Sequence, residues 1–144
     1  DVVKLVPEEL PILYGTESVE EAADKARKAG ATIVAVTLGD SGCYIDSPAG
    51  QTYVAAESVK AIDATGAGDA FTAGLLASLL HELAVRDPED PMASDDLRSR
   101  LRSLSAAQIK RAAIHANHLG ALACTAIGAT TALPRQPAPA GRVR

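Results

Sequence analysis

Apolar residues in the first third of the chain alternate between helical spacing and strand-like runs. Residues 32–38 (TIVAVTL) form a continuous β-branched and apolar run, which is typical of a parallel strand buried on both faces. A helix is predicted over 22–29, because Ser18 and Glu21 stand at capping-box spacing before it and Gly30 follows it as a stop. A shorter helix is predicted over 7–14, ending at Gly15.

The rest of the chain contains a hairpin signal and two longer helices. Strands over 43–45 and 51–55 flank the turn residues 47–50 (SPAG), and a further strand-like stretch covers 54–62. Helices are predicted over 66–83 and over 105–125, the second opened by Ser105 at capping-box spacing from Gln108. A charged loop with two prolines covers 86–91, and residues 135–144 are predicted to form a disordered tail. The alternation predicts a doubly wound α/β sheet that binds ligands at the carboxyl ends of its strands.

Composition indicates a globular piece and argues against two classes of partner. The 144 residues are 47% hydrophobic and 22% charged, which is ordinary for a folded domain. The 18 acidic and 14 basic residues give a net charge of −4, so no nucleic-acid partner is expected. Apolar runs are too short to cross a bilayer, so no membrane partner is expected and a cytoplasmic location is favoured. Cys43 and Cys124 are far apart in sequence and are predicted to be buried small hydrophobic residues.

A small-residue loop before the 66–83 helix carries the strongest chemical signal. Gly66, Ala67 and Gly68 let the backbone approach a ligand, and the helix directs its unpaired N–H groups and positive dipole end to the same place, which suits a phosphate. Asp69 follows in the first turn. The carboxylate would repel an anion bound beside it unless a reacting hydroxyl lies between the two, as in general-base catalysis of phosphoryl transfer. The alternative is an ordinary helix start with no ligand, since an acidic residue stabilises a first turn by itself.

Residues 63–71 (DATGAGDAF) resemble the C-terminal signature of the ribokinase-like (PfkB) carbohydrate kinases, in particular their fructokinase branch, with Ala64 where Thr is commonest. Segments 1–10, 36–42 and 117–134 resemble the family in the same order. The resemblance implies an α/β fold of the ribokinase-like three-layer αβα type with a mostly parallel sheet. It covers only the C-terminal half of such a kinase, so residues 1–134 are expected to form its ATP-binding and catalytic half. Most sugar contacts and the β-sheet lid of the family belong to the N-terminal half.

The resemblance implies an ATP-dependent sugar kinase in which Asp69 accepts the proton of the sugar hydroxyl. Residues 66–68 would form the anion hole through the Ala67 and Gly68 amides, and the ATP site would comprise Thr37, Leu38, Gly39, Asp40, Ser41, Gly42, Gly68 and Asn117. Taken alone, residues 39–42 are an everyday turn. The chain has no Walker loop, which leaves charge compensation to the anion hole, to Mg²⁺ and to either Lys4 or residues of the absent half.

Two metal sites are also implied by the resemblance. Glu9 matches the glutamate of the family's Asn-x-x-Glu pattern, which holds Mg²⁺ through water, although Val6 replaces the asparagine; the alternative is a solvated first turn after Pro7. A potassium loop would comprise Asp63, Thr65, Ala123, Ala126, Gly128 and Ala132, several of them through backbone carbonyls. Alternatively, Asp63 only ends a strand at a turn.

Several alternatives stay open at this stage. The chain is either a catalytic half or a non-catalytic nucleotide-binding fragment or scaffold, and the substrate is fructose, ribose, 2-keto-3-deoxygluconate or a nucleoside. A homodimer of the full-length parent is compatible with the resemblance. His115 and His118 lie three residues apart on a predicted helix without a third zinc ligand, so they are expected to be partly buried helix residues.

Overall fold

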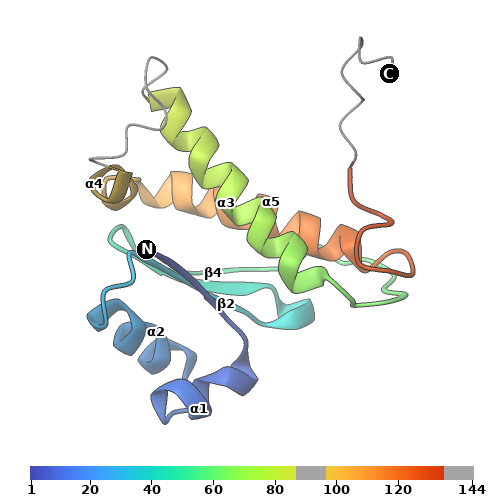
Figure 1. Cartoon of the computed structure of the whole chain (residues 1–144), viewed down its shortest axis with the longest axis horizontal. Coiled ribbons are helices and arrows are strands. Elements are labelled where there is room, and N and C mark those ends of the chain that lie inside the picture. Colours follow the sequence, from blue (N-terminus) through green and yellow to red (C-terminus); the bar gives the residue numbers. More distant parts are fainter. Residues whose placement is uncertain (87–96, 135–144) are drawn as a thin grey trace, which may run out of the picture.

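The fold is a three-layer sandwich with one sheet between two pairs of helices. The computed structural model describes residues 1–86 and 97–134. Helices α1 (Leu10–Tyr14) and α2 (Val19–Lys28) cover one face of the sheet, and α3 (Ala67–Arg86) and α5 (Ala106–Ala123) cover the other (Figure 1). A short helix, α4 (Leu97–Arg102), precedes α5. Arg86, the first residue of the predicted loop over 86–91, belongs to α3; the rest of that loop and the predicted tail over 135–144 lie outside the described residues.

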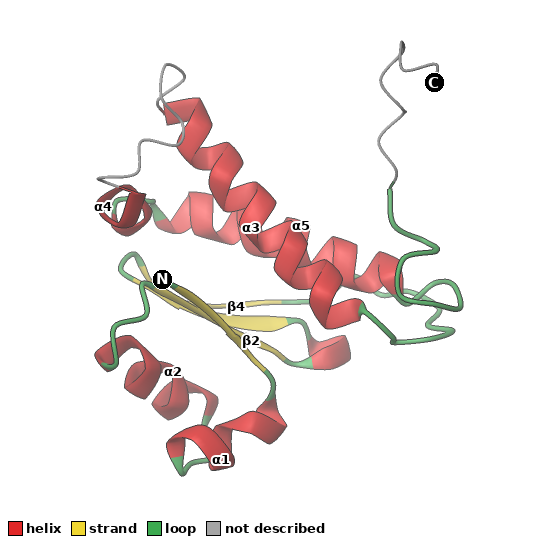
Figure 2. Cartoon of the chain, viewed as in Figure 1, coloured by secondary structure: helices red, strands yellow, loops and turns green. Residues whose placement is uncertain are grey.

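Among the described residues the sheet has four strands, in the order β1 (Val2–Leu5), β2 (Ile33–Thr37), β3 (Cys43–Ser47) and β4 (Gly50–Val54). β1 and β2 are parallel, while β2 with β3 and β3 with β4 are antiparallel. The predicted α/β layering is therefore found, with a mixed sheet in place of the mostly parallel one expected (Figure 2). The connections after β2 and β3 are too short for a parallel crossover, which requires a dozen or more residues.

Both faces of β2 are buried, as its apolar run predicts. Ile33 and Ala35 pack with α3 and α5, whereas Val34 and Val36 pack with α1 and α2. Side chains of successive strand residues point to opposite faces, so a central strand between two helical layers needs apolar residues at every position. This arrangement explains why residues 32–38 show no polar alternation.

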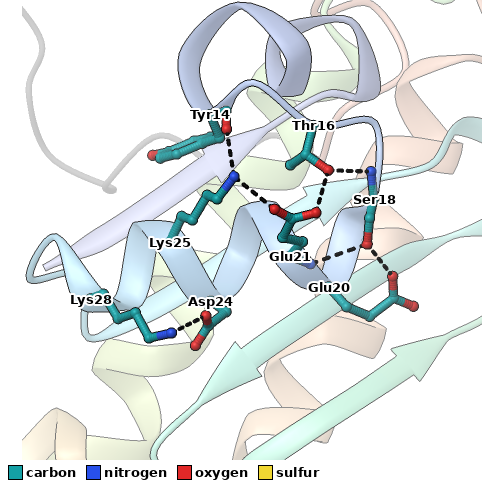
Figure 3. A network of polar contacts seen from close by, with 8 residues as sticks. All are labelled: Tyr14, Thr16, Ser18, Glu20, Glu21, Asp24, Lys25 and Lys28. Atoms are coloured by element: carbon teal, nitrogen blue, oxygen red, sulfur yellow. Dashed lines mark hydrogen bonds and ion pairs between the residues drawn. The ribbon is translucent and has the colours of Figure 1, made fainter.

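Helix α2 begins at Val19, three residues before the predicted start, and a polar network holds its N-terminus (Figure 3). Ser18 Oγ accepts a hydrogen bond from the Glu21 amide at 3.2 Å, as the capping-box spacing indicates. The Glu21 carboxylate accepts a hydrogen bond from Thr16 at 2.7 Å and pairs with Lys25, 2.7 Å away. Lys25 also donates to the Tyr14 carbonyl at 2.9 Å, so the network ties α1 to α2.

Helices α3 and α5 approach closely because small residues line their contact. A Cβ on Gly74 would lie 3.1 Å from the Ala116 Cα, and one on Gly120 would lie 3.3 Å from the Ala67 carbonyl oxygen. Phe71 and Leu75 fill the space between the helices and the sheet. The close approach brings the end of α5 beside the start of α3. No helix within residues 1–86 and 97–134 has the length and hydropathy of a membrane span.

The predicted strand over 54–62 is wrong beyond Val54, where β4 ends. Residues 55–62 form an irregular connection, and Ile62 is 58% exposed. Both ends of this connection bond to α5 or to the residue after it instead of to a strand: Asn117 Nδ2 donates to the Ala55 carbonyl, and the Ile62 amide donates to the carbonyl of Cys124, which caps α5. The apolar residues of this segment therefore do not indicate a strand.

Candidate active site

The loop over 63–69 ends at the first turn of α3 and carries the predicted anion hole. Gly66 has φ 80°, and a Cβ there would lie 2.6 Å from the Ala129 Cβ, so only glycine fits. The Ala67 amide donates to the Ala64 carbonyl at 3.1 Å. Within the described part of the chain, the amides of Gly68 and Asp69 have no such acceptor. The amides open to a ligand are thus those of Gly68 and Asp69, one residue later than the pair expected from the sequence.

Asp69 is exposed on this first turn. Its carboxylate makes no ion pair or hydrogen bond with any residue that the structure describes. An exposed, unpaired carboxylate next to open amides is free to accept a proton from a substrate hydroxyl.

Asp63 holds the loop to the segment that follows α5. One carboxylate oxygen accepts from the Thr65 amide and the other from the Gly128 amide, both at 2.9 Å. The Asp63 amide also donates to the Cys124 carbonyl at 3.2 Å. The hydrogen bonds from Thr65 and then Gly128 lower the pKa of Asp63 to about 2. Figure 1 shows this end of the α3 and α5 layer, where the loop before α3 and the segment after α5 lie side by side.

The lowered pKa of Asp63 predicts that acid releases this connection. A carboxyl whose pKa falls from 3.8 to about 2 on folding stabilises the folded loop fully above about pH 4, and the contribution is lost as the pH falls towards 2. We expect protection of the Gly128 amide against hydrogen exchange to decline across this window, as measured by NMR. In the Asp63→Asn variant the protection should be lower at neutral pH and should not change between pH 4 and 2. A pH-dependent decline that persists in this variant would assign the titration to another group.

The predicted nucleotide loop directly follows β2 at its carboxyl end. Residues 39–41 form one 3₁₀ turn, in which the Ser41 amide donates to the Leu38 carbonyl at 3.2 Å; the Leu38 amide in turn donates to the Gly42 carbonyl at 2.7 Å and joins the two ends of the loop. Thr37 Oγ1 donates to the Leu5 carbonyl at 3.3 Å, so the loop lies beside the end of β1. Because β1 and β2 are parallel, this is the edge at which ligands of open α/β sheets bind.

Gly42, at the end of the loop, packs closely against the connection after β4. Its φ is 101°, and a Cβ there would lie 2.1 Å from the Val54 carbonyl oxygen and 2.5 Å from the Ala56 nitrogen. Asn117, which is 7% exposed, donates to the same connection at Val54 and Ala55, at 2.9 and 3.1 Å. The structure therefore brings the predicted loop and the predicted Asn117 together through residues 54–56, which sequence reasoning did not single out.

A cleft of about 600 Å³ opens beside Asn117, between the connection after β4 and helix α5. Its lining comprises residues 55–57 together with Arg111, Ile114, His115, Asn117 and His118. Both histidines are exposed, so the expectation of partial burial is wrong, and His118 Nδ1 lies 2.6 Å from a Glu57 carboxylate oxygen. Only Asn117 was predicted to belong to the site, because no motif marks the other lining residues.

Cys43 lies in the hydrophobic core and is buried as predicted, whereas Cys124 is half-buried, and both thiols are free. Burial raises the pKa of the Cys43 thiol to about 11, against an opposing hydrogen bond with Asn117. Cys43 is therefore protonated and unreactive near neutral pH.

The predicted metal residues lie in two separate places. Glu9 accepts the Val6 amide with one carboxylate oxygen at 2.8 Å, directly after β1, and the carboxylate retains capacity for a metal-bound water. Asp63 and Gly128 are hydrogen-bonded to each other, while Ala126 and Ala132 follow α5 in the same irregular segment and Ala123 ends that helix. Described residues contain no cluster of three or more His, Cys, Asp or Glu side chains suited to a metal. A cation at the second place would depend on backbone carbonyl oxygens, which suit potassium.

The layered fold, with candidate site residues at the carboxyl ends of the parallel strands β1 and β2, places the chain among the open-sheet α/β proteins. The pattern of the "pfkB family carbohydrate kinase" matches residues 1–136, and the chain belongs to this family. The fructokinase of Escherichia coli is 36% identical over 135 residues, which are 93% of this chain and 38% of that protein.

Two solved structures are also similar. A fructokinase from Vibrio cholerae O395, in fructose-, ADP- and potassium-bound form, is 41% identical with a TM-score of 0.71 over 94% of this chain and 38% of that one. The aminoimidazole riboside kinase from Salmonella enterica, complexed with aminoimidazole riboside and an ATP analogue, is 32% identical with a TM-score of 0.69 over 92% of this chain and 38% of that one. The chain thus spans less than two-fifths of the length of these relatives.

Proposed function

We propose that residues 1–134 form the C-terminal, nucleotide-binding and catalytic half of an ATP-dependent sugar kinase. One observation carries the proposal: Asp69 is exposed on the first turn of α3, and among residues 1–86 and 97–134 neither its carboxylate nor the neighbouring Gly68 amide has a hydrogen-bond partner. A helix N-terminus stabilises an anion, and the neighbouring carboxylate has no other partner to neutralise it. A sugar hydroxyl attacking a phosphate would occupy the space between these groups.

In this proposal the side chain of Asp69 accepts the proton as the sugar hydroxyl oxygen attacks the γ-phosphate of ATP. The amides of Gly68 and Asp69 then hold the charge that develops on the phosphoryl oxygens. Asp63 fixes the loop against Gly128, which keeps these amides in place without reorganisation during the reaction. Positioning and charge stabilisation supply most of the rate in phosphoryl transfer, so these groups are the required kind.

The nucleotide would bind across the Thr37–Gly42 loop and the cleft beside Asn117. The cleft volume of about 600 Å³ is within the range of small-molecule sites. Because the side-chain amide of Asn117 donates to the carbonyls of residues 54 and 55, its role is to position the cleft wall. The adenosine part of ATP would then contact residues 55–57 directly.

Metal ions would complete the charge balance. Glu9 is suited to hold Mg²⁺ through water, and Mg²⁺ would neutralise the ATP phosphates. The carbonyl oxygens around Asp63, Thr65, Ala123, Ala126, Gly128 and Ala132 are the kind of ligand that potassium takes. The potassium-bound fructokinase structure supports this second assignment by similarity.

Fructose is the sugar that we favour as substrate, because several relatives are fructokinases at 31–36% identity. Aminoimidazole riboside is the second candidate, favoured by the relative from Salmonella typhimurium at 32% identity. Ribose, 2-keto-3-deoxygluconate and other nucleosides stay open, as do a non-catalytic nucleotide-binding role and homodimeric assembly of the full-length parent.

A coupled assay on the full-length protein tests the proposal. ADP release is measured with ATP, Mg²⁺ and K⁺ against fructose, aminoimidazole riboside, ribose and 2-keto-3-deoxygluconate in turn. We expect sugar-dependent ADP release, with the highest kcat/KM on fructose. Nucleotide binding without sugar-dependent turnover on any substrate would favour the non-catalytic alternative.

A further inference from the structure

Lys4 occupies a strand position where an apolar residue is expected. Successive residues of β1 point to opposite faces, and Val3 and Leu5 pack against α1 and α2. Val2 packs into the core beneath α3 and α5, so Lys4 shares that face. Its side chain is half-buried, and its backbone is paired in register with Ala35 of β2.

The ammonium group of Lys4 reaches the first turn of α3. A Cβ placed on Gly68 would lie 3.5 Å from Lys4 Nζ and 4.0 Å from its Cε. Gly68 therefore leaves room for the tip of this side chain. No carboxylate pairs with Lys4, and it makes no hydrogen bond, among residues 1–86 and 97–134. The carboxylate of Asp69, one residue further on, likewise has no partner in the part of the chain that the structure describes.

This placement of Lys4 is electrostatically unfavourable in the absence of a ligand. The N-terminus of a helix carries partial positive charge, so a second cation beside it is repelled. A half-buried ammonium group also loses part of its hydration. Both costs are removed if an anion binds between the helix and the lysine, since it would accept hydrogen bonds from the ammonium and from the open amides together.

We propose that Lys4 is a catalytic residue that contacts the phosphoryl group in transfer from the side of β1, opposite the amides of Gly68 and Asp69. The inference rests on the proposed kinase function. In the step, the sugar oxygen forms a bond to the γ-phosphorus while the bond from that phosphorus to the bridging oxygen of ADP breaks, and its electron pair leaves with ADP. The hydroxyl proton goes to Asp69. Lys4 keeps its proton throughout and supplies positive charge to the equatorial oxygens.

Lys4→Met and Lys4→Arg variants of the full-length protein test this role, with Lys110→Met as a matched control. Lys110 is an exposed lysine on α5, ten residues and thus about 15 Å along the helix from Gly120, which faces the start of α3. The measurements are kcat and KM for ATP and sugar, calorimetric affinities for ATP and ADP, and the thermal unfolding midpoint.

We expect Lys4→Met to lower kcat by about 100-fold, comparable with the loss of one donor from an oxyanion hole. Its affinity for ATP should fall by about tenfold relative to ADP, because only ATP carries the γ-phosphate. The midpoint should stay the same or rise, since an unpaired cation beside a helix N-terminus has been removed. Lys4→Arg should recover part of kcat, and Lys110→Met should match the wild type.

The outcomes separate this inference from the proposed function. Suppose that the wild type phosphorylates a sugar, but Lys4→Met keeps kcat within twofold or loses the same factor of affinity for ATP and for ADP. The proposed role of Lys4 is then wrong, while the proposed kinase function holds. If the wild type turns over no sugar, the proposed function fails, and a tenfold drop in the ATP-to-ADP affinity ratio still supports the phosphate contact. An unchanged ratio overturns it, as does a wild type that binds neither nucleotide.

Discussion

Replacing Asp69 by asparagine should abolish nearly all sugar-kinase activity of the full-length protein while leaving the fold intact. A positioned general base contributes about 10²- to 10⁴-fold, so kcat on fructose should fall within that range. The KM for ATP should change little, because the amides of Gly68 and Asp69 belong to the backbone and survive the substitution. Steady-state kinetics with the coupled assay measures both constants.

A matched control for this variant is Glu17→Gln, which makes the same carboxylate-to-amide change at an exposed position between α1 and α2. It should be indistinguishable from the wild type in kcat. Asp69 makes no contact that the structure describes, so Asp69→Asn should also unfold close to the wild-type temperature. Undiminished activity in Asp69→Asn would contradict the assignment of this residue as the base.

The second large effect is expected for stability, from Gly42→Ala. The new Cβ would lie 2.1 Å from the Val54 carbonyl oxygen and 2.7 Å from the Ala55 carbonyl carbon, and these backbone atoms cannot move without breaking the Asn117 hydrogen bonds. The residue would also hold φ 101°, which side chains other than glycine rarely adopt. Overpacking and backbone strain together should destabilise the protein by about 3 kcal/mol or more. Urea unfolding at equilibrium gives the value.

Gly39→Ala is the control for this experiment, because it lies in the same turn and also has a positive φ, 61°, yet a Cβ there would meet nothing within 4 Å. Its cost should be limited to the left-handed backbone, about 1–2 kcal/mol. The affinity for ADP should fall further in Gly42→Ala than in Gly39→Ala, since only Gly42 packs against residues 54–56. Equal losses of stability in the two variants would show that the close approach at Gly42 is unimportant.

Local signals predicted the helices of this chain well because their causes lie within a few residues. Ser105 and Gln108 form the reciprocal capping box that their spacing predicts, whereas Ser18 forms only half of one: its Oγ accepts the Glu21 amide, but its own amide donates to Thr16 Oγ1. The start of α2 lies three residues before the predicted one, because Val19, Glu20 and Glu21 form its first turn without showing an apolar pattern. The turn at 47–50 joins β3 to β4 as its residue types suggest.

Predictions failed where the cause lies in a distant segment. Residues 55–62 contain apolar side chains typical of a strand, yet the Ala55 carbonyl and the Ile62 amide bond to Asn117 of α5 and to Cys124 just after it, more than 50 residues away. The cleft residues Arg111, Ile114 and His115 follow no motif, since a cleft wall requires only side chains at its rim. The antiparallel pairing of β2, β3 and β4 has a local cause instead, the short turns between these strands; the expectation of a mostly parallel sheet came from the family resemblance.

The sequence by itself determined the family, the alternation of helices and strands, and the loop over 63–69, because each depends on short-range spacing or on a contiguous motif. Tertiary structure alone decided which amides remain open at α3, since the Ala67 amide turns back to Ala64. It also decided that Lys4 meets Gly68. These two residues are 64 positions apart in the sequence. Only the packing of α3 over β1 brings them together, and no local sequence pattern predicts a contact between residues so far apart in the chain.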